Sequence, residues 1–291
     1  MQHARTTSNK PPGALLDSHA IKSLALYGYC HLPTTLASKG ANAELFAHLD
    51  NMFSQRRSWL EQRLATEAHA FLGFRPAGYE KSLLHQNHEP CEQFKIGYYL
   101  EPVNNQEKST AGNALALYNP LHNDMIVSRY WHHIGLLAAA LFEHMAKTAG
   151  IPAQSISKLV QHPFHQLGLN HYRGCTRQRG DMLMGSHSDA SLLTIILPSA
   201  RGLQIEGPQG NWRELPPVAD SVIVLVGQFL ATLSEGYYCA PLHRVIDSTG
   251  SARYSLVYKY RANRLARVSL GNGDGFCPGE LYERKLQAIM H

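Results

Sequence analysis

The second half of this chain places the tightest limits on its fold, because after Ile156 it consists of short apolar segments separated by turn residues. Leu, Val, Ile and Tyr dominate these segments, with Gly, Pro, Asn and Asp between them: FHQLGLNHY, LLTIILP, GLQIEG, NWREL, SVIVLVG, LHRVID and RYSLVYKY. Short strands at regular spacing are typical of a β-sandwich or barrel. We therefore expect a mainly β double-sheet barrel, whose mouth is lined by inward side chains.

Apolar residues recur at helical spacing in the first half of the chain. The pattern predicts a helix near 15–27, one long helix or two over 41–68, and a long helix over 125–149 that Asp124 caps. These helices would brace the outside of the barrel. We expect one integrated structural unit, made of an N-terminal helical and mixed region that braces the barrel, a β-barrel core and a C-terminal tail or helix: 1–155, 156–270 and 271–291.

Composition excludes several classes of protein. The chain has 291 residues, 44% of them hydrophobic, and its net charge of +5 is scattered, so nucleic-acid binding is not expected. The 5 cysteines form no Cys-x-x-Cys pair and indicate reduced thiols. The N-terminus is polar, and the longest apolar run, 134–142, is far shorter than a membrane span. We expect a soluble, cytoplasmic monomer whose partner is a small molecule.

A His-x-Asp triplet, His187-Ser188-Asp189, runs directly into the apolar segment 192–197. Residues i and i+2 of an extended chain project from one face, so this pair could bind one metal ion from a buried strand. Similar triplets occur at 48–50 and 122–124. The first lies in a helical pattern, where i and i+2 point apart, and the second ends in the predicted helix cap. The triplet at 187–189 is therefore the predicted metal half-site.

His243, in PLHRVID, is the candidate third ligand, because the intervening strands can return the chain to the same end of the barrel. Two imidazoles and one carboxylate on one face of an octahedron describe a non-haem Fe(II) oxygenase site. A zinc hydrolase usually keeps one open coordination position instead of three. A lone buried histidine can equally be a core residue, so the assignment depends on the motif that follows.

Arg253 and Ser255 form a second i, i+2 pair, ten residues after His243. On a strand they share one face, where a guanidinium and a hydroxyl could hold a carboxylate. The same Arg-x-Ser pattern recurs at 56–58 and 267–269. The pair at 253–255 differs from the other two in lying close to His243 in the sequence.

Asn170 and Tyr172 are a third same-face pair, on the strand before His187, and could also point into the barrel. Ordinary packing would explain the tyrosine as well. The loop that follows is basic and connects two strands that lead to the metal, so it could rim the pocket and favour an anionic substrate. Its cations are Arg173, Arg177 and Arg179. The alternative is a solvated basic loop of little consequence.

These motifs resemble those of the isopenicillin N synthase-like 2-oxoglutarate/Fe(II) dioxygenases. The similar segments follow in the family's order and spacing: LNHY at 169–172, SHSDASLLTIIL, GLQI at 202–205, SEGYYCAPLHRV at 234–245 and RYSLVYKY at 253–260. The resemblance implies a double-stranded β-helix, a distorted and cupin-like jelly roll with flanking helices. The iron ligands that it implies are His187, Asp189 and His243. The residues that it implies for 2-oxoglutarate are Arg253, Ser255 and Tyr172 at the distal carboxylate, with Asn170 near the keto acid.

Two positions depart from the family pattern and leave the subfamily open. Gln228 stands where the family usually has Gly-Asp, and Arg173 stands where proline commonly follows the tyrosine. The resemblance implies that Fe(II), 2-oxoglutarate and O₂ oxidise a natural-product or amino-acid-like substrate. Hydroxylation is the default outcome, and desaturation or cyclisation would use the same residues. The alternatives are a non-catalytic metal-binding jelly-roll protein and a metal-dependent hydrolase.

Overall fold

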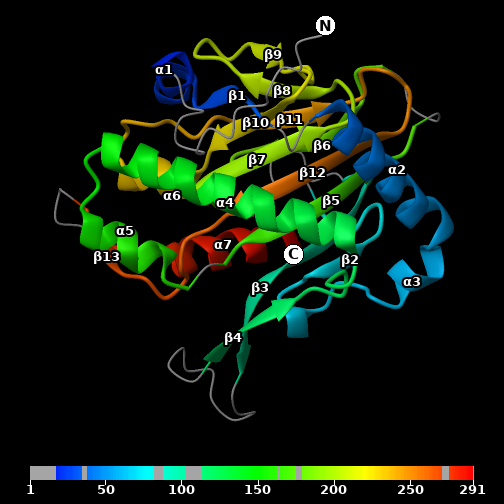
Figure 1. Ribbon diagram of the computed structural model, residues 1–291, viewed down its shortest axis with the longest axis horizontal. Helices are drawn as coiled ribbons and strands as arrows, with labels where there is room; N and C mark the ends of the chain where they lie inside the picture. The colour runs from blue at the N-terminus through cyan, green and yellow to red at the C-terminus, as the bar shows by residue number, and fades with distance from the viewer. Residues whose placement is uncertain are drawn as a thin grey trace, which may run out of the picture.

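Two antiparallel β-sheets form the centre of the computed structural model (Figure 1), which describes residues 18–34, 38–81, 88–102, 113–162, 164–174, 179–270 and 275–290. The strands of the larger sheet are β1 (Tyr29–Pro33), β2 (Gly73–Arg75), β3 (Cys91–Pro102), β4 (Asn113–Tyr118), β5 (Gln166–Tyr172), β7 (Leu193–Pro198), β10 (Ser221–Val226) and β12 (Arg253–Tyr260). They are ordered β1-β10-β7-β12-β5-β3-β2, and β4 pairs with β3.

The smaller sheet consists of β6 (Met182–His187), β8 (Leu203–Glu206), β9 (Trp212–Glu214) and β11 (His243–Ile246), in the order β6-β11-β8-β9. From β5 to β8 the chain alternates between the larger and the smaller sheet, and it does so again from β10 to β12. This alternation winds the two sheets into a double-stranded helix of β-strands. A separate short pair joins β13 (Val268–Ser269) to β14 (Gly275–Phe276). The predicted mainly β fold is confirmed.

Helix α4 (Met125–Thr148) lies along the outer face of the larger sheet (Figure 1). Its apolar stripe packs on β12, where the rings of Trp131 and Tyr258 have centroids 5.5 Å apart. Asp124 caps the helix as predicted, since its side chain accepts from the backbone N–H groups of Ile126 and Val127. The other helices are α1 (Ser18–Tyr27), α2 (Lys39–Gln55), α3 (Arg57–Glu61), the short 3₁₀ turn η3 (Glu67–His69), α5 (Ala153–Val160), α6 (Gln228–Leu233) and α7 (Pro278–Met290).

The predicted helices are present, with differences at their boundaries. The helical pattern over 41–68 forms two helices, because the chain leaves helical geometry at Arg56, and the second helix ends at Glu61 instead of near residue 68. The predicted start of the first helix, near residue 15, lies outside the described residues. Strands β1 to β4 come from before residue 155 yet pair within the larger sheet, while the division of the chain at residue 155 stays a prediction.

Within the described part of the chain, no helix is both long enough and apolar enough to span a bilayer. Four cysteines lie in that part, and none of them takes part in a disulfide: Cys30, Cys91, Cys239 and Cys277. Reduced cysteines are what the sequence pattern predicted.

Candidate metal centre

The two predicted histidine ligands face one another across the smaller sheet. His187 is the last residue of β6, His243 is the first residue of β11, and the antiparallel register pairs them directly. Their ring centroids lie 4.3 Å apart. The 54-residue separation between the two sequence motifs is thus closed by strand pairing, as the sequence predicted.

Asp189 lies beyond the end of β6, in the loop that crosses from the smaller sheet to β7 of the larger sheet. The prediction that His187 and Asp189 share a strand is therefore wrong, because the chain must leave the sheet to make this crossing. The start of α6 holds the loop, since the Gln228 N–H donates to the Asp189 carbonyl oxygen at 2.8 Å. A Cβ on Gly227 would lie 2.0 Å from the Ser191 carbonyl oxygen, so this close approach requires glycine.

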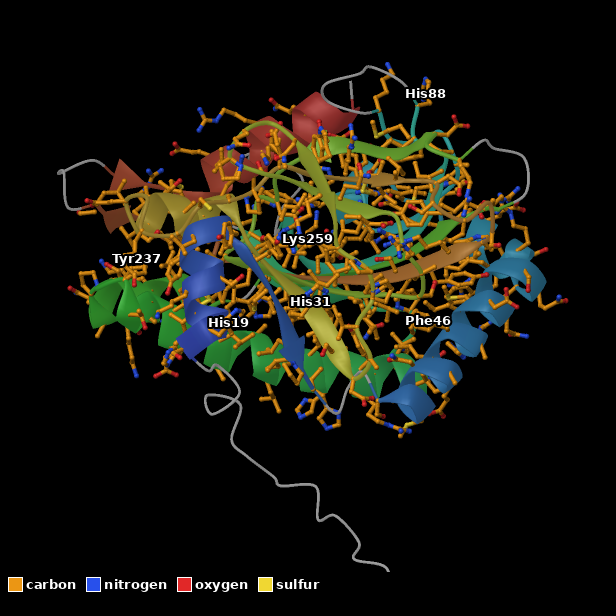
Figure 2. The ribbon with its side chains drawn as sticks, turned by 90° about the horizontal axis from the view of Figure 1, so that it is seen from above. His19, His31, Phe46, His88, Tyr237 and Lys259 are labelled. Atoms are coloured by element: carbon orange, nitrogen blue, oxygen red, sulfur yellow. The ribbon has the colours of Figure 1, made fainter. Side chains whose placement is uncertain are left out.

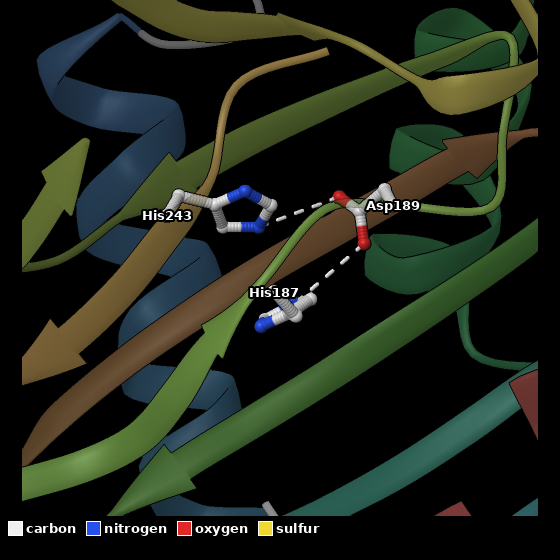
Figure 3. A group of neighbouring side chains, drawn as sticks. All are labelled: His187, Asp189 and His243. Atoms are coloured by element: carbon white, nitrogen blue, oxygen red, sulfur yellow. Dashed lines mark ion pairs between the residues drawn. The ribbon is translucent and has the colours of Figure 1, made fainter. Parts of the chain in front are cut away.

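The three side chains converge on a single point between the sheets (Figure 3). His187 Nε2 lies 3.7 Å from Asp189 Oδ1, and His243 Nε2 lies 3.6 Å from Asp189 Oδ2. One potential ligand atom from each residue falls within 4.8 Å of the others. The three donors therefore surround a space that one metal ion can fill.

Hydrogen bonds at the far side of each imidazole orient the ring. His187 Nδ1 lies 2.9 Å from the Gly185 carbonyl oxygen, and His243 Nδ1 lies 3.3 Å from the Pro241 carbonyl oxygen. A carbonyl can only accept, so we assign the proton to Nδ1 in both rings. The lone pair on each Nε2 then faces Asp189, which is the arrangement that metal-binding histidines use.

The charge states of the three residues also suit a metal. Burial, followed by the nearby His243, lowers the pKa of His187 to about 3. Burial likewise lowers the pKa of His243. Burial alone would raise the pKa of Asp189, but Lys259 and the two histidines hold this pKa well below its usual value. At neutral pH the site therefore presents two neutral imidazoles and one carboxylate, the forms that bind metal ions.

Asp189 also carries an unused acceptor. Its Oδ2 atom is buried and has no hydrogen-bond donor among the described residues. A buried acceptor without a donor is costly, so such an atom indicates a missing partner. Two imidazoles and one carboxylate, with no fourth protein ligand in the described cluster, fit the facial Fe(II) geometry.

The other two His-x-Asp triplets do not converge on a metal site. His48 Nε2 lies 2.7 Å from Asp124 Oδ2, and Asp124 also caps α4. Asp50 accepts a hydrogen bond of 2.6 Å from the hydroxyl of Tyr254. These residues join α2 to its neighbours and are structural, as the sequence indicated.

Arg253 lies in the same cavity as the metal triad, at the start of β12. Its side chain is buried, and Nε donates to the carbonyl oxygens of Ala200 and Arg201 at 3.2 Å. The guanidinium carbon lies 5.0 Å from the ring centroid of Tyr172. Nη1 is buried without an acceptor in the described part of the chain. A buried cationic donor without an acceptor fits a bound carboxylate.

The remaining residues predicted to bind 2-oxoglutarate line the same cavity. The register of β12 against β5 sets Arg253 opposite Tyr172 and Ser255 opposite Asn170. Side chains at alternate positions of paired strands share a face, so these four project together. The structure thus brings together every residue that the sequence singled out for this role.

The two described arginines of the basic loop after β5 do not line this cavity. Arg173 Nη2 pairs with Glu92 Oε1 at 2.8 Å, on the opposite face of the strands. Arg179 donates from Nε to the Ser248 carbonyl oxygen at 3.1 Å, and Arg177 lies outside the described residues. The predicted role of this loop as the rim of the pocket therefore has no support from its two described arginines.

Sequence reasoning missed a set of charged residues in the cavity. Lys259 Nζ lies 2.8 Å from Asp189 Oδ1, and Lys285 of α7 donates from Nζ to the Ser188 carbonyl oxygen at 2.5 Å. The period of two along β12 could have revealed Lys259, which is on the face of Arg253. The position of α7 against the barrel is a tertiary feature that no local pattern indicates. Gln228, one of the family departures, donates to Ser188 Oγ at 2.6 Å.

Comparison with known proteins places this site in a family. Residues 163–262, which contain the metal triad and the Arg253–Ser255 pair, match the model of the 2OG-Fe(II) oxygenase superfamily. This region belongs to that superfamily. Iron(II) and 2-oxoglutarate are accordingly the metal and the cosubstrate that fit the cavity.

Curated proteins from plants and fungi match part of this chain. A homoarginine-6-hydroxylase of Glycine max is 31% identical over 110 residues, covering 37% of this chain and 32% of the relative. Gibberellin 2-beta-dioxygenase 2 of Arabidopsis thaliana is 28% identical over 170 residues, covering 56% of this chain and 50% of the relative. The matches thus span between a third and a half of each relative's length.

Solved structures share the fold over nearly the whole chain. A Neurospora crassa protein crystallised with alpha-KG superposes with a TM-score of 0.73 at 19% identity, over 95% of this chain and 90% of the other. A rice dioxygenase for auxin oxidation has a TM-score of 0.69 at 17% identity, over 92% and 88% of the two chains. At these identities the likeness shows the fold, and it confirms the predicted double-stranded β-helix of 2OG-Fe(II) oxygenases.

Proposed function

We propose that this protein is an Fe(II)- and 2-oxoglutarate-dependent oxygenase that oxidises a small molecule. The observation that carries the proposal is that one cavity contains both a buried acceptor without a donor and a buried donor without an acceptor. Asp189 Oδ2 lacks a donor beside two inward histidines, and Arg253 Nη1 lacks an acceptor. A divalent metal satisfies the first group and a carboxylate satisfies the second.

In this proposal the iron ligands are His187, Asp189 and His243. The two imidazoles coordinate through Nε2, because Nδ1 of each ring is held by a backbone carbonyl. Iron held by these residues would supply, with 2-oxoglutarate and O₂, the oxidising power needed to oxidise the substrate. His187, Asp189 and His243 would hold the metal from one side and leave its other positions open to small ligands.

Arg253 and Ser255 then bind the distal carboxylate of 2-oxoglutarate, through the guanidinium and the hydroxyl. Tyr172 packs its ring against that guanidinium, which holds the charge in place in a dry environment. Asn170 lies nearer to the keto acid. Burial of Arg253 makes its contact with a carboxylate stronger than it would be in water.

The proposed substrate is a natural-product or amino-acid-like small molecule, and we expect it to be anionic. Curated relatives carry the names of gibberellin dioxygenases and of a homoarginine hydroxylase, which supports a small organic substrate. Hydroxylation is the expected outcome, with desaturation or cyclisation set by where the substrate carbon lies. The cytoplasmic location and the monomeric state stay predictions from the sequence.

The test is the release of succinate from 2-oxoglutarate by the purified protein, with Fe(II) and O₂ supplied. The wild-type protein should release succinate slowly without substrate, and chelation of the metal should stop the release. His243→Ala should be inactive, whereas the matched control His122→Ala should keep wild-type turnover, because His122 is exposed and remote from the triad. Absence of Fe(II)-dependent succinate from the wild type contradicts the proposed function.

A further inference from the structure

The inner face of β12 is charged at both ends. Alternate residues of this strand and its extension line the cavity, so the face reads Arg253, Ser255, Val257, Lys259 and Arg261. The strand rises about 3.3 Å per residue, which separates the first and fourth of these positions by about 20 Å along the backbone. Figure 2 shows the lysine of this row toward the middle of the molecule. Cations thus occupy both ends of this row, and the uncharged Ser255 and Val257 separate them.

Lys285 adds a third cation at the end occupied by Lys259 and Arg261. It comes from α7, and its Nζ donates to the Ser188 carbonyl oxygen, within the His-x-Asp triplet. Lys259 contacts the Asp189 carboxylate of the same triplet. Lys259 and Lys285 therefore lie beside the metal triad. Arg261 lines the cavity two residues beyond Lys259, whereas Arg253, at the other end of the row, is held by backbone carbonyls.

Of the carboxylates that line the cavity, only Asp189 pairs with one of these three cations, Lys259. Glu80 is occupied by Arg75 and by Lys95, whose Nζ lies 2.6 Å from Glu80 Oε1. Glu89 accepts from the Gly185 N–H at 3.0 Å. Asp189 remains, and it is the carboxylate that the metal requires.

Two of the three cations form no ion pair with a described carboxylate. Lys285 has only the Ser188 carbonyl oxygen as its acceptor in the described contacts. Arg261 stacks on Tyr282, with 4.6 Å between the guanidinium carbon and the ring centroid. The Nε atom of Arg261 is buried without a hydrogen-bond partner within the described residues. A buried donor of this kind needs an acceptor from outside the chain.

Metal binding would increase this demand for an anion. A divalent cation bound to Asp189 would compete with Lys259 for the negative charge of that carboxylate. It would also add two positive charges beside the lysine. Partly buried charges without compensation are strongly unfavourable. The loaded site should therefore attract an anion more strongly than the metal-free site.

We propose that Lys259, Arg261 and Lys285 form a second anion site, which binds an oxyanion of the substrate beside the metal. The proposal rests on the proposed function, because it names the substrate class of that same cavity. A carboxylate, a phosphate or a sulfonate could supply the oxyanion. The site lies next to Asp189, so the oxidised carbon is only a few bonds from the anionic group.

The test is calorimetric binding of matched probes to the anaerobic Fe(II)·2-oxoglutarate complex and to the metal-free protein. The probes are benzoate with its neutral analogue benzamide, inorganic phosphate and methanesulfonate, which separate the three possible oxyanions. At least one oxyanion should bind, and benzamide should bind at least tenfold more weakly than benzoate if the carboxylate is the preferred group. Fe(II) should strengthen binding of the preferred anion.

Variants locate the site. Lys285→Met and Arg261→Met should each lower the affinity for the preferred anion about tenfold, as expected for the loss of one charge-assisted hydrogen bond. Both variants should leave the affinity for 2-oxoglutarate unchanged. Lys285→Arg should largely keep anion binding, and the exposed control Lys147→Met should be indistinguishable from wild type. Arg253→Ala should have the converse effect, with weak 2-oxoglutarate binding and intact anion binding.

Three results would overturn the second anion site. Anion affinity could be unchanged in both Lys285→Met and Arg261→Met, the oxyanions could bind no better than benzamide, or the anions could compete with 2-oxoglutarate. Failure of the proposed function appears differently, as a wild-type protein that binds no 2-oxoglutarate with Fe(II). Anion binding to the metal-free protein that depends on Lys285 would survive that failure.

Discussion

The two faces of β12 differ in whether their buried polar side chains find hydrogen-bond partners within the protein. On the outer face, Tyr258 and Tyr260 are buried against α4, and Tyr254 donates to Asp50. On the inner face, Arg253 keeps a buried Nη1 without an acceptor, and nearby Asp189 keeps an acceptor without a donor. Folding alone explains the outer face, because each side chain there finds packing or a partner within the chain.

The inner face is explained by ligands. Unpaired buried polar groups are rare in native proteins, since each one costs free energy of folding. An acceptor on Asp189 and a donor on Arg253 that are both unpaired in one cavity indicate that a cation and an anion complete the structure. The comparison therefore predicts that outer-face changes alter the free energy of unfolding, and that inner-face changes alter binding.

The largest effect is expected at the metal triad. His243→Ala should abolish measurable Fe(II) binding, because it removes one of three ligands from an open site that has no protein replacement in the described cluster. Equilibrium dialysis of Fe(II) under anaerobic conditions measures this, with His122→Ala as the control. Full iron affinity in His243→Ala would mean that another set of residues binds the metal.

On the outer face, Tyr258→Ala should lower the free energy of unfolding by about 3–5 kcal/mol, since it removes a fully buried aromatic ring. Urea denaturation measures this loss. The folded fraction should keep its Fe(II) and 2-oxoglutarate affinities. A stable variant with altered 2-oxoglutarate binding would remove the distinction between the two faces.

Glu92 lies on the outer face of β3, and its carboxyl group should make the free energy of unfolding depend on pH. Burial alone would raise its pKa, but hydrogen bonds from His171, Arg173 and Arg57 lower the pKa from 4.5 to about 2. A lowered carboxyl pKa contributes stability above the unfolded value, and this stability is lost as the pH falls from 4.5 toward 2.

Glu92→Gln should therefore lower the free energy of unfolding by about 3 kcal/mol at neutral pH. The difference from wild type should shrink as the pH falls through that range. Urea denaturation at several pH values measures both effects. A difference that does not change with pH would show that the charge of Glu92 is not what stabilises the fold.

A smaller effect is expected from Arg253→Ala, which removes a charged contact and no metal ligand. The 2-oxoglutarate concentration for half-maximal turnover should rise about 10- to 100-fold, the range for a hydrogen bond to a charged group. Lysine should restore only part of the affinity, because it cannot bind a carboxylate through a planar fork. The exposed Arg267→Ala serves as the control, and an equal effect there would move the site to the other Arg-x-Ser motif.

Much of the site was predictable from local rules. The period of two along a strand places Arg253 with Ser255, and Asn170 with Tyr172, on shared faces. Strand pairing then brings His243 opposite His187. These features depend on sequence spacing and on the existence of the barrel, both of which the sequence indicates.

The rest depends on tertiary structure. Asp189 lies off the strand because the chain crosses between sheets there, and no local pattern marks that crossing. Glu80 and Lys95 come from a region without clear periodicity, and they meet only when β3 enters the larger sheet. Lys285 reaches the cavity because α7 packs beside it, a placement set by contacts distant in sequence.

The central claim is that one cavity binds Fe(II) through the triad and 2-oxoglutarate through Arg253. Anaerobic titration with Fe(II) and then 2-oxoglutarate, followed by visible absorption, tests it most directly. We predict a weak charge-transfer band that appears only when both are present, is absent in His243→Ala, and requires more 2-oxoglutarate in Arg253→Ala. A metal-dependent hydrolase or a non-catalytic metal-binding protein would bind metal without this band. Fe(II) binding by the wild type with no band at saturating 2-oxoglutarate would contradict the claim.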